Sequence, residues 1–274
     1  MNTKQKSGIL ILTECGIMIA LSTVLSIFNF PVMPYGGSIT LASMLPIVIV
    51  AYRYGVLIGS GSALATSAIQ MLLGLKNFTF FTSWQSIVTL AVFDYLLAFT
   101  VFGLVGIFRG KIKNQSVAMA TGALIASIIR YACHVISGAT IWAGLSIPTE
   151  AALVYSLSYN ATYMIPETVV LVLSAAYIGA SLDFSKRVPK RIHTERAPIA
   201  SYCYIGAGLC VLAALITDTV LVFSKLQNAD SGELSMSGIG EVNWIAFAIV
   251  TAVALAATAA LILVGKFKEK AKAG

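Results

Sequence analysis

The stretch from Arg130 to Glu167 is mostly apolar, but it contains several polar and ionisable side chains that could bind a ligand. Read as a helix, the first part of this stretch places Arg130, His134, Gly138 and Trp142 on one face, at four-residue steps. An ionisable group at membrane depth is costly unless it faces a partner or a cavity. We therefore interpret the stretch as a helical hairpin that forms one wall of a binding site.

Three residues of the first helix fit a flat, positively charged ring. Gly138 leaves space against the helix backbone, and the indole of Trp142 offers a π-face to a cation. His134 adds a ring that can donate or accept a hydrogen bond. The alternative for His134 is a histidine that is simply hydrogen-bonded within a core, which is a frequent role of a lone helical histidine.

The second helix of the hairpin carries Tyr155, Asn160 and Glu167, with Pro166 inside it. The Asn160 amide offers a donor and an acceptor to the edge of a heteroaromatic ring, or else a hydrogen bond to a neighbouring helix. Tyr155 is either a ligand contact or an anchor at the membrane interface. We expect Glu167 to bond to a neighbouring helix rather than to line the site.

A carboxylate beside a phenol, Asp94 and Tyr95, lies about a third of the way into the preceding apolar segment. A carboxylate at that depth must be paired with a cation or placed to bind one. Two interpretations stay open: a contact to a cationic ligand, or an internal salt bridge with Arg130 that satisfies both charges.

The composition is that of an integral membrane protein. Of the 274 residues 58% are hydrophobic and 11% are charged, whereas a soluble domain carries about 25% charged residues. The net charge of +7 comes from short basic clusters between apolar runs, which is typical of cytoplasmic loops and not of a surface that binds nucleic acid. No metal-ligand spacing, catalytic triad or phosphate-binding glycine loop is present, so we expect no metal, no cofactor and no enzymatic activity.

We expect an all-α, polytopic fold with eight segments in the membrane lipid, since about 20 apolar residues cross a bilayer. The segments cover about residues 8–28, 41–52, 54–75, 84–108, 116–143, 150–180, 200–223 and 244–265. The Pro- and Gly-rich piece 29–38 is expected to be an outer loop. The third segment is rich in Gly, Ala and Ser, which favours close helix packing.

The basic residues predict that both termini are cytoplasmic. With this orientation, all Lys and Arg residues except Lys76, Arg130 and Lys225 fall in inner segments, as the positive-inside rule requires. We expect a six-helix membrane core at 1–185, a basic cytoplasmic connector at 186–199, and a two-helix membrane appendage at 200–274. No internal repeat is visible, which counts against a secondary transporter.

Four stretches resemble the thiamine-specific substrate-binding (S) components of energy-coupling factor transporters. They are GGSITLASMLP at 36–46, Asp94-Tyr95 with Ala98-Phe99, RYACHVISG at 130–138, and YSLSYN at 155–160 with the following Tyr163-Met164 and Pro166-Glu167. The resemblance covers roughly residues 8–182. Its specific part is the spacing from His134 through Trp142 and Tyr155 to Asn160.

The resemblance implies a six-helix fold in the plasma membrane that captures thiamine from outside the cell. It implies that the thiamine pocket lies under a lid that includes Tyr35, Gly36 and Gly37. The residues that would line the pocket are Asp94, Tyr95, His134, Gly138, Trp142, Tyr155 and Asn160. It also implies that Gly16 and Ala20, a small-xxx-small pair on the first helix, dock on a transmembrane coupling subunit. That subunit would be driven by two cytoplasmic ATPases, so ATP hydrolysis would take place in the partners.

The sequence also departs from the family. Asp94 is found where we would expect the longer Glu of some members, and Tyr35 is found where we would expect a Trp. The two appended helices lie outside the six-helix core.

One alternative function is an S component for another small heteroaromatic compound, such as a thiamine precursor, whose binding would depend less on Asp94. Another alternative is a stand-alone secondary transporter that uses the extra helices and Asp218. A membrane enzyme is the least favoured hypothesis.

Overall fold

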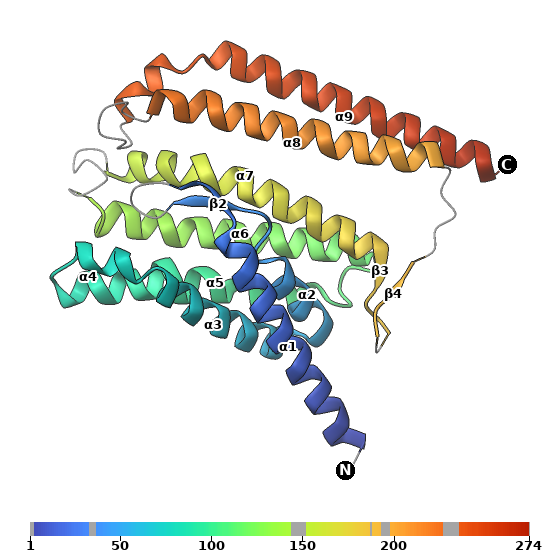
Figure 1. Cartoon of the computed structure of the whole chain (residues 1–274), viewed down its shortest axis with the longest axis horizontal. Coiled ribbons are helices and arrows are strands. Elements are labelled where there is room, and N and C mark those ends of the chain that lie inside the picture. The colour runs from blue at the N-terminus through green and yellow to red at the C-terminus, as the bar shows by residue number, and fades with distance from the viewer. Residues whose placement is uncertain are drawn as a thin grey trace. The chain divides into compact units, whose positions relative to one another are not determined.

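The computed structural model describes residues 3–32, 37–143, 152–186, 188–192, 198–226 and 236–273. The chain separates into two compact units, Met1–Ile192 and His193–Gly274, which we describe one at a time. Helices dominate both units (Figure 1). Within the described residues, seven helical segments are long and apolar enough to cross a membrane. The predicted all-α, polytopic membrane class is therefore confirmed.

The first unit contains most of the elements. In chain order they are α1 (Thr3–Ile27), β1 (Asn29–Val32), β2 (Ser38–Thr40), α2 (Leu45–Tyr54), α3 (Val56–Leu73), η1 (Leu75–Phe80), α4 (Trp84–Thr89), η2 (Leu90–Leu97), α5 (Ala98–Thr100), η3 (Val101–Phe108), α6 (Gln115–Thr140), α7 (Ala152–Ser181), β3 (Leu182–Asp183) and β4 (Lys190–Arg191). The long helices α6 and α7 run side by side (Figure 1). They form the helical hairpin that the sequence predicts.

The second predicted membrane segment is α2, a helix of ten residues, which is shorter than a bilayer requires. It is also a central element of the core, because Ile47, Val48 and Val50 are completely buried. Pro46 lies in its first turn, where a missing backbone N–H does no harm. The helix ends at Gly55, whose φ of 85° suits glycine, and α3 starts directly afterwards.

Small residues bring α3 close to its neighbours. A Cβ at Gly59 would come within 2.6 Å of the Ala51 Cβ in α2, and a Cβ at Gly106 in η3 would lie 2.5 Å from the Val56 nitrogen. Any larger residue would force these backbones apart. The close packing expected for this glycine-rich segment is confirmed.

The segment between α1 and α2 contains a β-hairpin where the sequence indicates only a loop. The strands β1 and β2 are antiparallel, with Asn29 opposite Thr40 and Val32 opposite Ser38. After β2 the chain turns sharply through Ala42, which has a φ of 54°. This is the left-handed region that a side chain with a Cβ rarely adopts.

The segment 84–108 is helical throughout, as predicted, but it is not one regular α-helix. It begins at the Ser83 cap, whose hydroxyl accepts a hydrogen bond from the Ser86 N–H. The middle part, η2, is a π-helix, and the last part, η3, is a 3-10 helix. π-Helical segments are rare and are often found at functional sites.

The second unit consists of α8 (Pro198–Leu226), η4 (Met236–Glu241) and α9 (Trp244–Ala273). The two long helices pack along each other (Figure 1). Asp218 of α8 accepts a hydrogen bond of 2.7 Å from the Thr251 hydroxyl of α9. This bond ties the two helices together inside their apolar surroundings.

Candidate functional site

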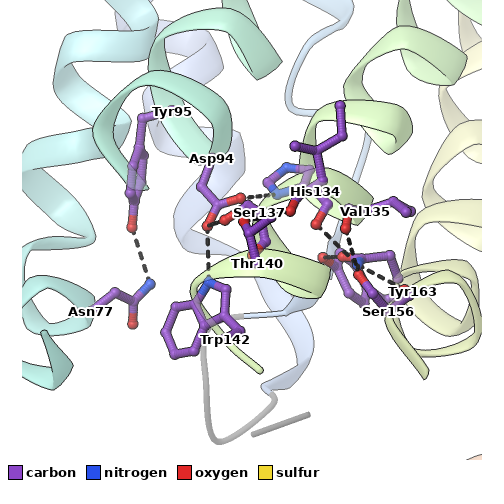
Figure 2. A network of polar contacts seen from close by, with 12 residues as sticks. Asn77, Asp94, Tyr95, His134, Val135, Ser137, Thr140, Trp142, Ser156 and Tyr163 are labelled. Carbon is purple, nitrogen blue, oxygen red and sulfur yellow. Dashed lines mark hydrogen bonds and ion pairs between the residues drawn. The ribbon is translucent and has the colours of Figure 1, made fainter. Parts of the chain in front are cut away.

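Three helical segments of the first unit bring the predicted polar residues together (Figure 2). The π-helix η2 supplies Asp94, α6 supplies His134, and the residues just after α6 supply Trp142. The helix α7 adds Tyr155 and Asn160 from the other arm of the hairpin. The site is therefore built on helices that pack along each other within one unit.

The Asp94 carboxylate is the centre of this cluster. One of its oxygens accepts hydrogen bonds from the Ser137 hydroxyl at 2.8 Å and from the Trp142 indole N–H at 3.1 Å. The other oxygen lies 3.0 Å from Nδ1 of His134. The side chains of Asp94 and His134 are only 13% and 14% exposed. One carboxylate thus fixes the positions of two rings, imidazole and indole.

The alternative in which Asp94 forms a salt bridge with Arg130 is wrong. Arg130 pairs with Glu167 of α7, with its Nη1 2.9 Å from the carboxylate. The expectation that Glu167 bonds to a neighbouring helix is therefore confirmed. The negative charge of Asp94 remains free of a permanent cation among the described residues, apart from the titratable ring of His134.

One ring nitrogen of His134 takes no part in the contact with Asp94. A carboxylate beside Nδ1 favours a proton on that nitrogen, which leaves Nε2 as a hydrogen-bond acceptor. Nε2 is buried and has no hydrogen-bond partner in the part of the chain that the structure describes. Buried polar atoms are almost always satisfied, so this atom marks a place where a ligand could donate a hydrogen bond.

Trp142 does not extend the helical face on which the sequence places it. The helix α6 ends at Thr140 and not near residue 143. The Thr140 hydroxyl bonds to the carbonyls of Ile136 and Ser137 in this last turn. Asp94 and Phe81 then orient the indole. The Phe81 ring meets it edge-on, with 4.9 Å between ring centroids.

A cluster of aromatic and apolar side chains surrounds the indole. Phe81, Leu90, Tyr95 and Trp142 are buried in it, and Tyr155 packs against it. The structure therefore brings Tyr155 and Trp142 together as predicted, although they come from different arms of the hairpin. Gly138 is buried on the same helix as His134.

Tyr95 points its hydroxyl away from Asp94 (Figure 2). The hydroxyl accepts a hydrogen bond from the Asn77 amide at 3.0 Å and donates to the Gly74 carbonyl at 3.2 Å. The ring stacks on Phe78, with 5.7 Å between the centroids. Tyr95 thus supports the aromatic cluster, and its polar group is already occupied.

The Asn160 amide is also occupied. Its nitrogen donates to the Ser156 carbonyl at 2.9 Å and to the His134 carbonyl at 3.3 Å, and its oxygen accepts from the Tyr163 hydroxyl at 2.5 Å. The bond to His134 joins α7 to α6, which is the interhelical role left open in the sequence analysis. A ligand could reach this amide only by replacing one of these bonds.

The remaining predicted positions are the lid residues and the docking pair on α1. Tyr35 and Gly36 fall outside the described residues, whereas Gly37 is buried just before β2. Gly16 and Ala20 are exposed on α1. A Cβ at Gly16 would have no atom of the described residues within 4 Å, so this face of α1 is open within the chain.

Sequence reasoning missed Ser137, which donates to the central carboxylate. It is completely buried and stands three residues after His134, hence on the same helix face. That spacing was the signal that could have identified it. Within the described residues, no group of three or more His, Cys, Asp or Glu could hold a metal ion.

A family model described as thiamine transporter protein matches residues 12–183. The chain belongs to the thiamine transporter family. This confirms the family that the sequence motifs indicate, and the match includes all the candidate ligand residues from Asp94 to Asn160. The helices α8 and α9 lie beyond the matched region.

A curated member of this family is the thiamine transporter ThiT of Bacillus subtilis (strain 168). It is 34% identical over an alignment of 177 residues, and the alignment covers 61% of this chain and 88% of the relative. A solved structure of ThiT from Listeria monocytogenes shares the fold, with a TM-score of 0.51 and 20% identity. The alignment covers 62% of this chain and 93% of that one.

Proposed function

We propose that the chain is the thiamine-binding S component of an energy-coupling factor importer in the plasma membrane. The observation that carries this proposal is the pairing of the Asp94 carboxylate with an unsatisfied Nε2 on His134 beside the Trp142 indole. Such a site, in a member of the thiamine transporter family, offers what a cationic heteroaromatic ligand needs.

The chemistry of thiamine matches the groups that the site offers. Its thiazolium ring is positively charged, so it gains from the carboxylate of Asp94 and from the face of an indole. Its aminopyrimidine ring is flat and carries an amino group that can donate a hydrogen bond to His134. Tyr155 and Gly138 complete the enclosure, as the family resemblance implies.

Transport would need partners, because the site binds a ligand but offers no route for using ATP. The exposed pair Gly16 and Ala20 on α1 would dock on a transmembrane coupling subunit, since small residues allow close approach of a second helix. Two cytoplasmic ATPases would drive that subunit. The positive-inside distribution of Lys and Arg supports cytoplasmic termini.

The proposal assigns a different role to each of three parts of the chain. Residues 1–185 would bind the ligand, 186–199 would be a cytoplasmic connector, and 200–274 would be a membrane appendage. The strand β4 lies within this connector and pairs with β3 of the first part, with Leu182 opposite Arg191. The appended helices are not needed to build the site, because every candidate ligand residue lies in the first unit.

A thiamine titration of the full-length protein in detergent tests the proposal. Tryptophan fluorescence should be quenched with saturation at submicromolar thiamine, because a ring stacked on Trp142 would quench its emission. The variant Trp142→Phe should lose the quenching, since Trp84 and Trp244 are 69% and 48% exposed and lie outside the site.

Other outcomes of the titration point to the alternatives. No response up to millimolar thiamine, in protein shown to be folded, would remove thiamine as the ligand. Tighter binding of the isolated pyrimidine would favour a precursor transporter. Uptake by the purified protein alone under an ion gradient would favour a secondary transporter.

Ser137→Ala should weaken thiamine binding by about tenfold. The variant removes one hydrogen bond to the charged carboxylate of Asp94, and the loss of such a bond costs roughly 1.5 kcal/mol or more. Ser158→Ala is the matched control, because among the described residues the Ser158 hydroxyl bonds only to the Val154 carbonyl of its own helix. Isothermal titration calorimetry of both variants gives the comparison, and equal affinities would show that Ser137 does not hold the carboxylate.

A further inference from the structure

A short β-hairpin at the end of α7 carries exposed cations (Figure 1). Its strands β3 and β4 are antiparallel, with Leu182 opposite Arg191 and Asp183 opposite Lys190. The side chains of Lys186, Lys190 and Arg191 are exposed. The strand β3 follows α7 directly, so no spacer separates these cations from a membrane-spanning helix.

Hydrogen bonds and a buried ring hold this hairpin on the first unit. The Gln115 amide nitrogen at the start of α6 donates to the Leu182 carbonyl at 2.6 Å, and its oxygen accepts from the Phe184 N–H at 3.1 Å. The Phe184 side chain is buried. The Arg53 guanidinium donates to the Lys186 carbonyl at 3.5 Å. The exposed cations therefore belong to a structured element and not to a free loop.

A second basic segment leads to the same contact. Arg109, Lys111 and Lys113 are exposed and lie between η3 and α6. Gln115, which bonds to the hairpin, follows two residues after Lys113. The two segments bring six exposed cations of the described chain to one end of the first unit, and Asp183 is the one acidic residue in their sequence. Like charges repel, so an anionic partner would stabilise this end.

The length of α7 indicates where this end lies in a membrane. The helix has 30 residues, which is about 45 Å at 1.5 Å per residue, and a bilayer with its headgroups is about 40–45 Å thick. The end of α7 therefore reaches the headgroup layer. Val188 and Ile192, beside the cations of the hairpin, are 67% and 42% exposed. Exposed apolar side chains next to cations are typical of surfaces that lie on a membrane interface.

We propose that the exposed cations of 109–113, 182–186 and 188–192 form a binding surface for anionic phospholipid headgroups of the cytoplasmic leaflet. The Lys and Arg side chains would donate hydrogen bonds to phosphate oxygens, and Val188 and Ile192 would contact the start of the acyl chains. This rests on the proposed cytoplasmic side of this end but not on thiamine binding. The candidate thiamine site lies at the opposite end of α6, near His134.

Lys190→Gln combined with Arg191→Gln tests the surface. Both side chains are exposed, and the pairing of β3 with β4 uses only the backbone, so the fold should be unchanged. Native mass spectrometry of the full-length protein in detergent, titrated with phosphatidylglycerol, gives the apparent affinity. The double variant should bind roughly thirtyfold more weakly, because each cation near an anionic lipid surface contributes about a fivefold factor.

Two further variants check that charge in this surface is responsible. Lys111→Gln combined with Lys113→Gln should weaken the binding of phosphatidylglycerol to a similar extent, because these residues form the other part of the surface. Lys190→Arg keeps the charge and should bind like the wild type.

Lys266→Gln combined with Lys268→Gln is the matched control. It also removes two exposed cations, but from α9 of the second unit, so the affinity for phosphatidylglycerol should be nearly unchanged. Phosphatidylcholine has no net charge and should bind equally to the wild type and to every variant.

The outcomes separate this inference from the proposed function. Equal affinity for phosphatidylglycerol in the wild type and the Lys190/Arg191 variant would overturn the inference. Equal losses in the Lys266/Lys268 variant would also overturn it, because only the total charge would then matter. Displacement of the lipid by millimolar inorganic phosphate would show a site for free anions instead. Thiamine affinity, measured on the same samples, should be equal in all variants, and a wild-type protein that binds no thiamine would overturn the proposed function alone.

Discussion

Replacing Asp94 by asparagine should weaken thiamine binding by about 100-fold. The carboxylate provides the negative charge facing the thiazolium ring and accepts bonds from Ser137 and Trp142. An amide oxygen could still accept from both donors, but its NH₂ group would replace the oxygen that faces Nδ1 of His134. The amide also has no charge, so it cannot attract the cation. Losing a charge-assisted contact reduces the binding free energy by roughly 1.5–3 kcal/mol, and each 1.4 kcal/mol is about a factor of ten in affinity. Calorimetric titration of the full-length variant measures the change.

Asp218→Asn provides the control for this experiment. Asp218 is also a carboxylate in an apolar helix, and it accepts a hydrogen bond from Thr251, but it lies in the second unit. Its replacement should leave thiamine affinity unchanged. If Asp94→Asn binds as tightly as the wild type, the ligand carries no cation near this residue. A neutral heteroaromatic, such as a thiamine precursor, would then be the better candidate.

Gly106→Leu should strongly destabilise the first unit. A Cβ at this position would lie 2.5 Å from the Val56 nitrogen, 2.6 Å from the Gly55 carbonyl carbon and 2.8 Å from the Ala51 oxygen. All three are backbone atoms, so no side chain can move aside to make room. Overpacking of this kind destabilises by about 3 kcal/mol, which corresponds to a fall of roughly 10 °C in the unfolding temperature. Thermal unfolding in detergent measures the shift.

Gly61→Leu is the counterpart on the neighbouring helix α3. A Cβ at Gly61 would have no atom of the described residues within 4 Å, so the new side chain would meet only the lipid or detergent. The unfolding temperature should stay close to that of the wild type. Similar losses in both variants would contradict the close contact between η3 and the α2–α3 turn.

The membrane segments could be predicted well because the bilayer restricts the options so strongly. A chain in lipid must satisfy its backbone internally, so a run of about 20 apolar residues is almost certain to be a helix. The β1–β2 hairpin could not be predicted in this way. Its segment contains Pro31, Pro34 and Gly36, which favour loops, and its pairing depends on packing against other elements.

The site could be predicted in its residue types but not in its orientations. Asp94, His134 and Trp142 converge as their chemistry suggested. The partner of Arg130 could not be chosen from the sequence, because Asp94 and Glu167 are both carboxylates at membrane depth. The rotation of each helix about its axis decides which one it meets. Local irregularities set that rotation, and spacing alone does not reveal them.

The π-helix η2 has a consequence for comparing this protein with its relatives. Each residue turns an α-helix by about 100°, and a π-helical turn takes up one residue more than an α-helical turn. A relative that lacks one residue between Leu90 and Leu97 could keep an ordinary α-helix there. An alignment would then have to place its gap on the correct side of Asp94. A gap on the wrong side would equate Asp94 with a residue that faces the lipid, and a genuine ligand carboxylate would be read as lost in evolution.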